Sequence, residues 1–202
     1  MRKALLLVDI QNDFLPGGSL AVPDGDKVIP VANSAIPLFE IVLASQDWHP
    51  DGHCSFASRY PGYKPGETIL IDGIEHALWP DHCILGTRGA EIAPGIDLGR
   101  IHSFFRKGTE KDSDSYSAFF DNDRRKSTGL MEYLKEHGVG EITIIGLTTE
   151  YCVQFTSLDA RSLGLQVKVV LDGIRGVEMN PGDCEEALDN MSSAGVEILQ
   201  RL

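Results

Sequence analysis

A buried strand that leads directly into a helix is predicted by the sequence Glu141-Ile-Thr-Ile-Ile-Gly-Leu-Thr-Thr-Glu-Tyr-Cys-Val153. The β-branched run 142–145 is typical of a strand, Gly146 ends it, and Thr149 is suited to cap the helix that follows. Cys152 then falls in the first helical turn, where free N–H groups and the helix dipole favour the reactive thiolate. From its position alone, Cys152 is either a catalytic nucleophile or a small buried hydrophobic residue.

The remaining strands and helices predict an α/β fold. Apolar runs typical of strands occupy residues 4–8, 41–44, 142–145 and 167–171, and weaker runs occupy 101–105 and 196–199. Helical patterns occupy residues 183–194, a stripe at 130–134, and the segment 25–39, whose limits Pro30 and Pro37 obscure. Continuous apolar strands that alternate with helices are typical of a parallel sheet covered on both faces. We therefore expect a Rossmann-like, three-layer α/β/α sandwich around a mainly parallel sheet of roughly six strands.

The composition suits one compact domain with an acidic surface. The chain has 202 residues, 42% of them hydrophobic, and a formal net charge of −12, so we expect a single domain over residues 1–202. The negative charge repels phosphate and anionic lipid, which argues against nucleic-acid and membrane partners. The first apolar run is too short to span a bilayer and has no signal-peptide pattern, so we expect a cytoplasmic protein with reduced thiols.

One long segment, residues 48–100, has a different composition from the rest of the chain. It is rich in glycine, proline, histidine and aromatic residues. Long irregular segments inside compact domains are usually functional or disordered, and the histidines and tryptophans here favour function. We expect this segment to bind a metal and the substrate.

Chemically active side chains follow several of the predicted strands. Asp9 follows the first, Asp47 and His49 follow the second, Lys107 follows the weaker run 101–105, and Cys152 follows the strand that begins this section. In open α/β sheets, ligands bind beyond the carboxyl ends of the strands, so these side chains are expected to lie near one another.

Asp9 and Lys107 each have a structural and a catalytic interpretation. Asp9 either caps a turn or acts as a general base, because burial would raise the pKa of its carboxyl towards that of a thiol. Lys107 is either a solvated surface charge or a cation that favours ionised Asp9 and Cys152 and stabilises developing negative charge.

A metal site is predicted around Asp47 and His49, which are two residues apart and share a face of the strand end. With a further histidine, either His53 or His82, they form an O/N ligand set suited to zinc, manganese or iron. A structural site that uses cysteine ligands is the alternative. The remaining candidates are Cys54 and Cys83 as soft ligands, His76, His102 and His137 as surface or core residues, and Cys184 as a core residue on a helix stripe.

Five sequence blocks, spread from Asp9 to Ala160, resemble a known enzyme family. They are Leu7-Val-Asp-Ile-Gln-Asn-Asp-Phe14 with Pro16-Gly17-Gly18-Ser19-Leu20, Ser45-Gln-Asp-Trp-His-Pro50, Trp79-Pro-Asp-His-Cys83, Phe105-Arg-Lys-Gly108, and 146–153. In this order they resemble the nicotinamidase/pyrazinamidase group of the isochorismatase-like cysteine hydrolases. The resemblance implies the isochorismatase-like hydrolase fold.

The resemblance also implies roles for individual residues. It implies a catalytic triad of Asp9, Lys107 and Cys152, and one divalent metal ion, with zinc as the first choice and manganese or iron as alternatives. The implied metal ligands are Asp47, His49 and His82, with waters completing the shell and with His53 and Ser55 as open candidates. The implied oxyanion hole consists of the backbone N–H groups of Thr148 and Cys152, next to a cis peptide between Leu147 and Thr148. The implied pocket walls are Phe14, Trp79 and Tyr116.

Two residues depart from the family pattern. Thr148 stands where alanine is usual, and Glu150 where aspartate is usual. Neither change removes a catalytic group, but the Thr148 hydroxyl adds a polar atom beside the expected oxyanion hole.

The function implied by the resemblance is the hydrolysis of nicotinamide to nicotinic acid and ammonia in NAD salvage, through a cysteine thioester, with pyrazinamide as a further substrate. A homo-oligomer is compatible with the sequence. One alternative is a related cysteine amidohydrolase that acts on a carbamoyl or ureido compound. An alternative of another class is a non-catalytic metal-binding α/β module, which would have no need of Asp9, Lys107 or Cys152. A flavodoxin-like nucleotide-binding protein is excluded, because no glycine-rich phosphate loop follows the first strand.

Overall fold

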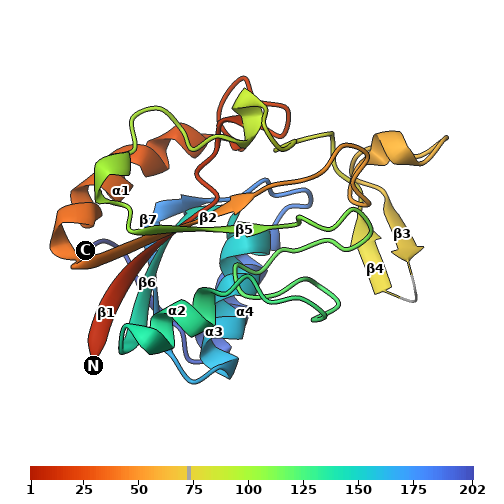
Figure 1. The fold of residues 1–202 in the computed structure, drawn as a ribbon. Helices are drawn as coiled ribbons and strands as arrows, with labels where there is room; N and C mark the ends of the chain where they lie inside the picture. Colours follow the sequence, from red (N-terminus) through yellow and green to blue (C-terminus); the bar gives the residue numbers. More distant parts are fainter. Residues whose placement is uncertain (72–73) are drawn as a thin grey trace.

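A six-stranded sheet forms the centre of the molecule (Figure 1). The computed structural model describes residues 1–71 and 74–202. The strands lie in the order β5-β2-β1-β6-β7-β8, and each neighbouring pair is parallel. Their bounds are Arg2–Val8 (β1), Ile41–Asp47 (β2), Ser103–Lys107 (β5), Val139–Leu147 (β6), Gln166–Arg175 (β7) and Glu197–Leu199 (β8). The prediction of a mainly parallel sheet of about six strands is confirmed.

Helices cover both faces of the sheet, and the side chains of β1 alternate between the two resulting cores. Leu5 and Leu7 pack in the core beneath α1 (Val28–Ala35). Leu6 and Val8 pack in the opposite core, which includes residues of the other three α-helices. These helices are α2 (Leu130–Glu136), α3 (Gln154–Ser162) and α4 (Asp183–Ser193), and Figure 1 shows them together on one side of the sheet. The predicted three-layer arrangement is therefore confirmed.

Two details of the helices differ from the sequence prediction. The segment 25–39 contains two 3₁₀ turns, Gly25–Lys27 and Ile36–Leu38, on either side of the eight-residue α1. Cys184 is half-buried, and its Sγ lies 3.8 Å from Glu150 Oε2, so the prediction that it belongs to the core is wrong.

In the described part of the chain, no helix has the length and apolar character needed to cross a bilayer.

The segment 48–100 consists mostly of turns and bends, with one small two-stranded sheet. This antiparallel sheet pairs β3 (Thr68–Ile71) with β4 (Ile74–Ala77), and the sequence prediction missed it. Three short 3₁₀ turns complete the regular structure: Ala57–Arg59, Arg88–Ala90 and Leu98–Arg100. In Figure 1 the β3–β4 pair projects to one side of the main sheet. Isolated bridges from His49 to Ile84 and from Phe56 to Trp79 connect parts of the segment to each other.

Candidate active site

The carboxyl ends of four parallel strands, β1, β2, β5 and β6, bring Asp9, Asp47, Lys107 and Cys152 together. Asp47 and Lys107 are the last residues of β2 and β5 and pair with each other in the sheet register. Asp9 follows β1, with φ of +48°, a left-handed conformation that aspartate tolerates better than most residues. Its carbonyl accepts a 2.8 Å hydrogen bond from the Gln11 N–H, so Asp9 lies in a turn while its side chain is fully buried.

Lys107 is the centre of this group. Its Nζ forms an ion pair with Asp47 and lies 3.0 Å from Asp9 Oδ2 and 3.4 Å from Cys152 Sγ. It also donates a 2.9 Å hydrogen bond to the Ser115 carbonyl. The Lys107 side chain is fully buried, so its charge is compensated by these groups and not by water.

Burial and the lysine charge act in opposite directions on the neighbouring acids. Burial raises the pKa of the Cys152 thiol well above its ordinary value, although Lys107 opposes the shift. Burial likewise raises the pKa of Asp9 against the influence of Lys107. For Lys107, burial is outweighed by Asp47 and Asp9, and its pKa is raised. The lysine therefore stays charged, and the thiol needs a base to become nucleophilic.

Cys152 is held in a short π-helical turn, Thr149–Val153, which precedes α3. Thr148 occupies the N-cap position of this turn and its carbonyl accepts hydrogen bonds from the N–H groups of Tyr151 and Val153, at 3.2 and 3.0 Å. The prediction that Thr149 caps the helix is wrong, because Thr149 is the first residue inside the turn and no side-chain cap forms at Thr148. The peptide between Leu147 and Thr148 is cis, as expected.

The ligand atoms of Asp47, His49 and His82 lie within 4.8 Å of one another. The Nε2 atoms of His49 and His82 lie 3.7 and 3.8 Å from Asp47 Oδ2. Each histidine uses its other nitrogen, Nδ1, for a bond to a backbone carbonyl, of Gly108 at 2.9 Å and of Pro80 at 2.7 Å. Such carbonyl bonds fix the tautomer and direct Nε2 towards a metal ion. The donor set therefore fits a divalent ion.

The electrostatics of His82 and Asp47 also suit a metal ion. Burial lowers the pKa of His82 to about 4, so its ring is neutral at pH 7 and has a free lone pair. For Asp47, burial acts to raise the pKa, but Lys107 and His49 prevail and hold it well below the usual range. Asp47 is consequently an ionised candidate ligand.

His53 and Ser55, the two open candidates, bond to each other. Ser55 Oγ lies 2.8 Å from His53 Nδ1, and the Ser55 N–H donates to the same nitrogen at 3.3 Å. His53 Nε2 lies 3.2 Å from the Ser113 carbonyl, which can only accept. Both ring nitrogens are thus engaged, and the ring stacks on His49 with centroids 4.1 Å apart. In this geometry the His53 ring packs on His49 and both of its nitrogens have hydrogen-bond partners, so whether His53 is a metal ligand stays an open prediction.

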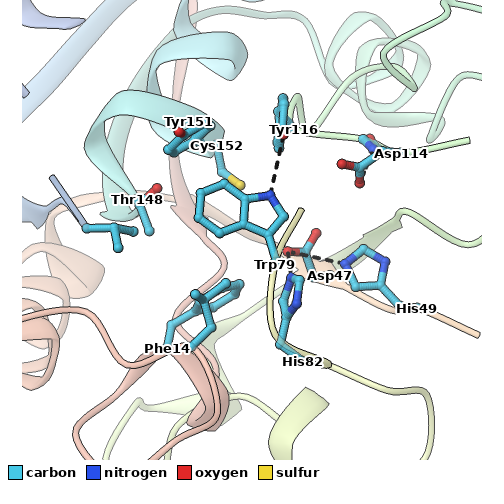
Figure 2. Close-up of a pocket in the computed structure, with 13 residues that line it drawn as sticks. Phe14, Asp47, His49, Trp79, His82, Asp114, Tyr116, Thr148, Tyr151 and Cys152 are labelled. Atoms are coloured by element: carbon cyan, nitrogen blue, oxygen red, sulfur yellow. Dashed lines mark hydrogen bonds and ion pairs between the residues drawn. The ribbon is translucent and has the colours of Figure 1, made fainter. Parts of the chain in front are cut away.

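A small pocket opens onto both the cysteine and the candidate metal ligands. Figure 2 shows Phe14, Trp79, Tyr116, Tyr151 and Thr148 around it, with Cys152, Asp47, His49 and His82. Trp79 Nε1 donates a 3.4 Å hydrogen bond to the Tyr116 hydroxyl, and the Trp79 and Tyr151 rings meet edge to face at 4.8 Å. Its aromatic walls suit a small flat molecule.

Several residues that the sequence analysis did not select contribute to this site. Ser45 Oγ donates a 2.7 Å hydrogen bond to Asp9 Oδ1. Asp114, Ser115 and Tyr151 line the pocket. Ser45 lies two residues before Asp47 on β2 and so shares its face, and the same spacing just beyond the predicted run 41–44 could have indicated it. The loop that carries Asp114 and Ser115 has no periodic pattern that could have placed them.

Comparison with known proteins identifies the family. The isochorismatase domain model matches residues 3–201. The Escherichia coli nicotinamidase is 48% identical over 97% of this chain and 93% of its own length. The structure of an Acinetobacter baumanii nicotinamidase/pyrazinamidase superposes with a TM-score of 0.95 at 43% identity, over 98% of this chain and 96% of its own. A Pyrococcus horikoshii pyrazinamidase in complex with zinc gives 0.82 at 37% identity, over 99% of both chains.

The fold, the buried cysteine group and these similarities define one class of protein: the chain belongs to the isochorismatase family. Within that family it groups with the nicotinamidases and pyrazinamidases. The predictions of the family and of an amide-hydrolysing enzyme are confirmed.

Proposed function

We propose that this enzyme hydrolyses nicotinamide to nicotinic acid and ammonia, as a step of NAD salvage, and that it also accepts pyrazinamide. The observation that carries the proposal is that Cys152 and the Asp47–His49–His82 group border the same aromatic pocket. A nucleophile and a candidate ring-binding site at two ends of one small pocket suit an amide attached to a nitrogen-containing ring.

In the proposed mechanism, Asp9 takes the proton of the Cys152 thiol as the sulfur attacks the carboxamide carbon. The backbone N–H groups of Thr148 and Cys152 donate to the oxygen that becomes negatively charged. Asp9 then returns the proton to the departing ammonia, which leaves a thioester on Cys152. A water molecule, deprotonated by Asp9, attacks the thioester carbon, the C–S bond breaks, and Asp9 returns the proton to the Cys152 sulfur as the acid is released.

Lys107 supplies a fixed positive charge throughout these steps. Its ammonium lies within 3.4 Å of both the nucleophilic sulfur and the base, so it stabilises negative charge on either one as the proton moves. It does not need to transfer a proton, because its own pKa is raised and it stays charged.

We propose zinc as the metal, with manganese and iron also compatible with this ligand set. Asp47, His49 and His82 would hold it, and the zinc complex of the Pyrococcus horikoshii enzyme supports the choice. The bound ion would supply a positive centre that orients the pyridine nitrogen, and fixing the reacting geometry can lower a barrier by about 7–11 kcal/mol. The substrate ring would lie between Phe14, Trp79 and Tyr116.

We also propose that residues 1–202 form one domain, which the family match over residues 3–201 supports. The four cysteines are all free, and this supports a cytoplasmic location.

The experiment that tests the function measures ammonia release from nicotinamide by zinc-loaded protein, with and without a strong chelator. We expect rapid release that the chelator abolishes and added zinc restores. If the zinc-loaded protein releases no ammonia from nicotinamide but cleaves a carbamoyl or ureido compound, the proposal is wrong. Activity that is unchanged by complete zinc removal would contradict the role of the metal.

A further inference from the structure

Asp114 is a buried carboxylate in the pocket to which the proposed mechanism gives no role. Asp114 is 3% exposed, and it lines the pocket beside Tyr116 and His49 (Figure 2). Among the residues that the structure describes, its Oδ2 atom has no hydrogen-bond partner. The other buried carboxylate oxygen without a hydrogen bond, Asp9 Oδ2, differs because Lys107 Nζ lies 3.0 Å away.

The backbone fixes Asp114 firmly in this position. Its Oδ1 accepts a 2.8 Å hydrogen bond from the Ser115 N–H, and its carbonyl accepts one of 2.8 Å from the Asn122 N–H. The Asn122 side chain also accepts a 2.9 Å hydrogen bond from the Tyr116 N–H. The free Oδ2 is thus held in place by the loop and is not the end of a mobile side chain.

Within residues 1–71 and 74–202, no neighbour of Asp114 forms a hydrogen bond to Oδ2. Asp114, His49 and His53 have polar atoms within 4.8 Å of one another. However, His49 Nδ1 is bonded to the Gly108 carbonyl, and both nitrogens of His53 are bonded to Ser55 and Ser113. A carboxylate oxygen can only accept, so its partner must be a donor that enters the pocket.

We infer that Asp114 Oδ2 accepts a hydrogen bond from a water molecule bound to the metal ion at the Asp47–His49–His82 site. A metal-bound water is a strong donor, whereas an unprotonated pyridine nitrogen is an acceptor and cannot satisfy a carboxylate. Asp114 lies on the His49 side of the site and not within the Asp47–His49–His82 cluster, which favours contact through water over direct coordination. The inference rests on the metal centre of the proposed function and makes Asp114 a positioning residue for the metal shell.

The test compares zinc affinities of two variants that lose the same charge. Asp114→Asn keeps the shape of the side chain but removes the charge from the pocket. Asp121→Asn is the control, because Asp121 is also buried but does not line the pocket. Burial raises the pKa of Asp121 to about 6, so measurements at pH 8 ensure that the control substitution removes a full charge.

The measurement is the dissociation constant for zinc, obtained by competition with a chromogenic chelator in the absence of substrate. Loss of an outer-shell partner weakens metal binding by about 10- to 100-fold, which we expect for Asp114→Asn, with a change below about twofold for Asp121→Asn. If Asp114→Asn does not fold, Asp114→Ser is used, since serine can still accept the Ser115 N–H bond.

Equal zinc affinity of wild type and Asp114→Asn would overturn the inference. So would a zinc X-ray absorption spectrum in which the variant has lost one protein ligand, because Asp114 would then coordinate directly. This outcome is distinct from failure of the proposed function. A protein that does not hydrolyse nicotinamide can still bind zinc more tightly as the wild type than as Asp114→Asn.

Discussion

Lys107 Nζ lies 3.4 Å from Cys152 Sγ and also forms an ion pair with Asp47, one of the candidate metal ligands. A single buried ammonium therefore contacts the proposed nucleophile, its proposed base and the candidate metal site. This arrangement couples the two halves of the site, because any change in charge at Asp47 alters the charge balance around Cys152.

Removal of this ammonium should destabilise the protein strongly. We expect Lys107→Met to lower the free energy of unfolding of the metal-free protein by about 3–5 kcal/mol, because Asp9 and Asp47 would be buried without a cation. Urea unfolding measures the change. Lys27→Met is the control, since Lys27 pairs with Asp24 at the surface and should contribute about 1 kcal/mol or less. An equal decrease in the free energy of unfolding of both variants would show that the buried ion pairs of Lys107 stabilise the protein no more than a surface ion pair does.

Cys152→Ala should abolish turnover without loss of the metal. Removal of a nucleophile lowers kcat by roughly 10⁴-fold or more, while the zinc dissociation constant should stay within about twofold. Ammonia release and zinc titration give the two values. Cys184→Ala is the matched control, because its half-buried thiol lies beside Glu150 and not in the pocket. Residual activity of Cys152→Ala near the wild-type rate would remove the cysteine from the mechanism.

The pH dependence of the reaction should report Asp9. The base must be ionised, so kcat/KM should rise with pH, and this rise should lie above pH 3.8 because burial raises the pKa of Asp9 from that value. The hydrogen bond from Ser45 stabilises the charged form, so Ser45→Ala should move the rise to higher pH by roughly one unit.

The control for this experiment is Ser58→Ala, which removes a hydroxyl that donates to Asp81 at the surface. The profiles should be recorded at constant free zinc, with the zinc occupancy measured at each pH, so that metal loss is not mistaken for protonation of Asp9. A Ser45→Ala profile that coincides with the wild type, or that moves to lower pH, would contradict the role of Asp9 as the base.

His82 and His53 should respond differently to substitution, although both are buried beside His49. His82→Ala removes a free Nε2 and should weaken zinc binding by about 100-fold or more. His53→Ala removes a ring that stacks on His49 but has no free nitrogen, so we expect a loss of about tenfold or less. Zinc titration of both variants measures these losses of affinity. If His53→Ala loses more zinc affinity than His82→Ala, His53 is a metal ligand.

The strength of each strand prediction follows from the position of the strand in the sheet. The clear apolar runs correspond to β1, β2, β6 and β7, which lie inside the sheet and are covered on both faces. The two weaker runs correspond to β5 and β8, which are its edges. Edge strands have exposed positions, such as Phe104 at 42%, so their sequences are more mixed.

The site could be predicted where the sheet itself places the side chains. The carboxyl ends of parallel strands lie on the same side of a sheet, and this rule predicts that Asp9, Asp47, Lys107 and Cys152 lie close together. Asp114 could not be predicted, because its position depends on hydrogen bonds from Ser115 and Asn122 within a loop. The Cys184 prediction failed because the apolar spacing of α4 does not reveal that its first turn faces Glu150 instead of the core.

The pairing of β1 with β6 has a consequence for folding. These strands are neighbours in the sheet, but most of the chain separates them in sequence. Asp9 and Cys152 follow these two strands, so the reactive pair exists only after the slow, long-range closure that parallel topologies require. Recovery of ammonia release after dilution from denaturant should therefore report completed folding of the whole sheet, and a fragment that lacks either strand should have no activity.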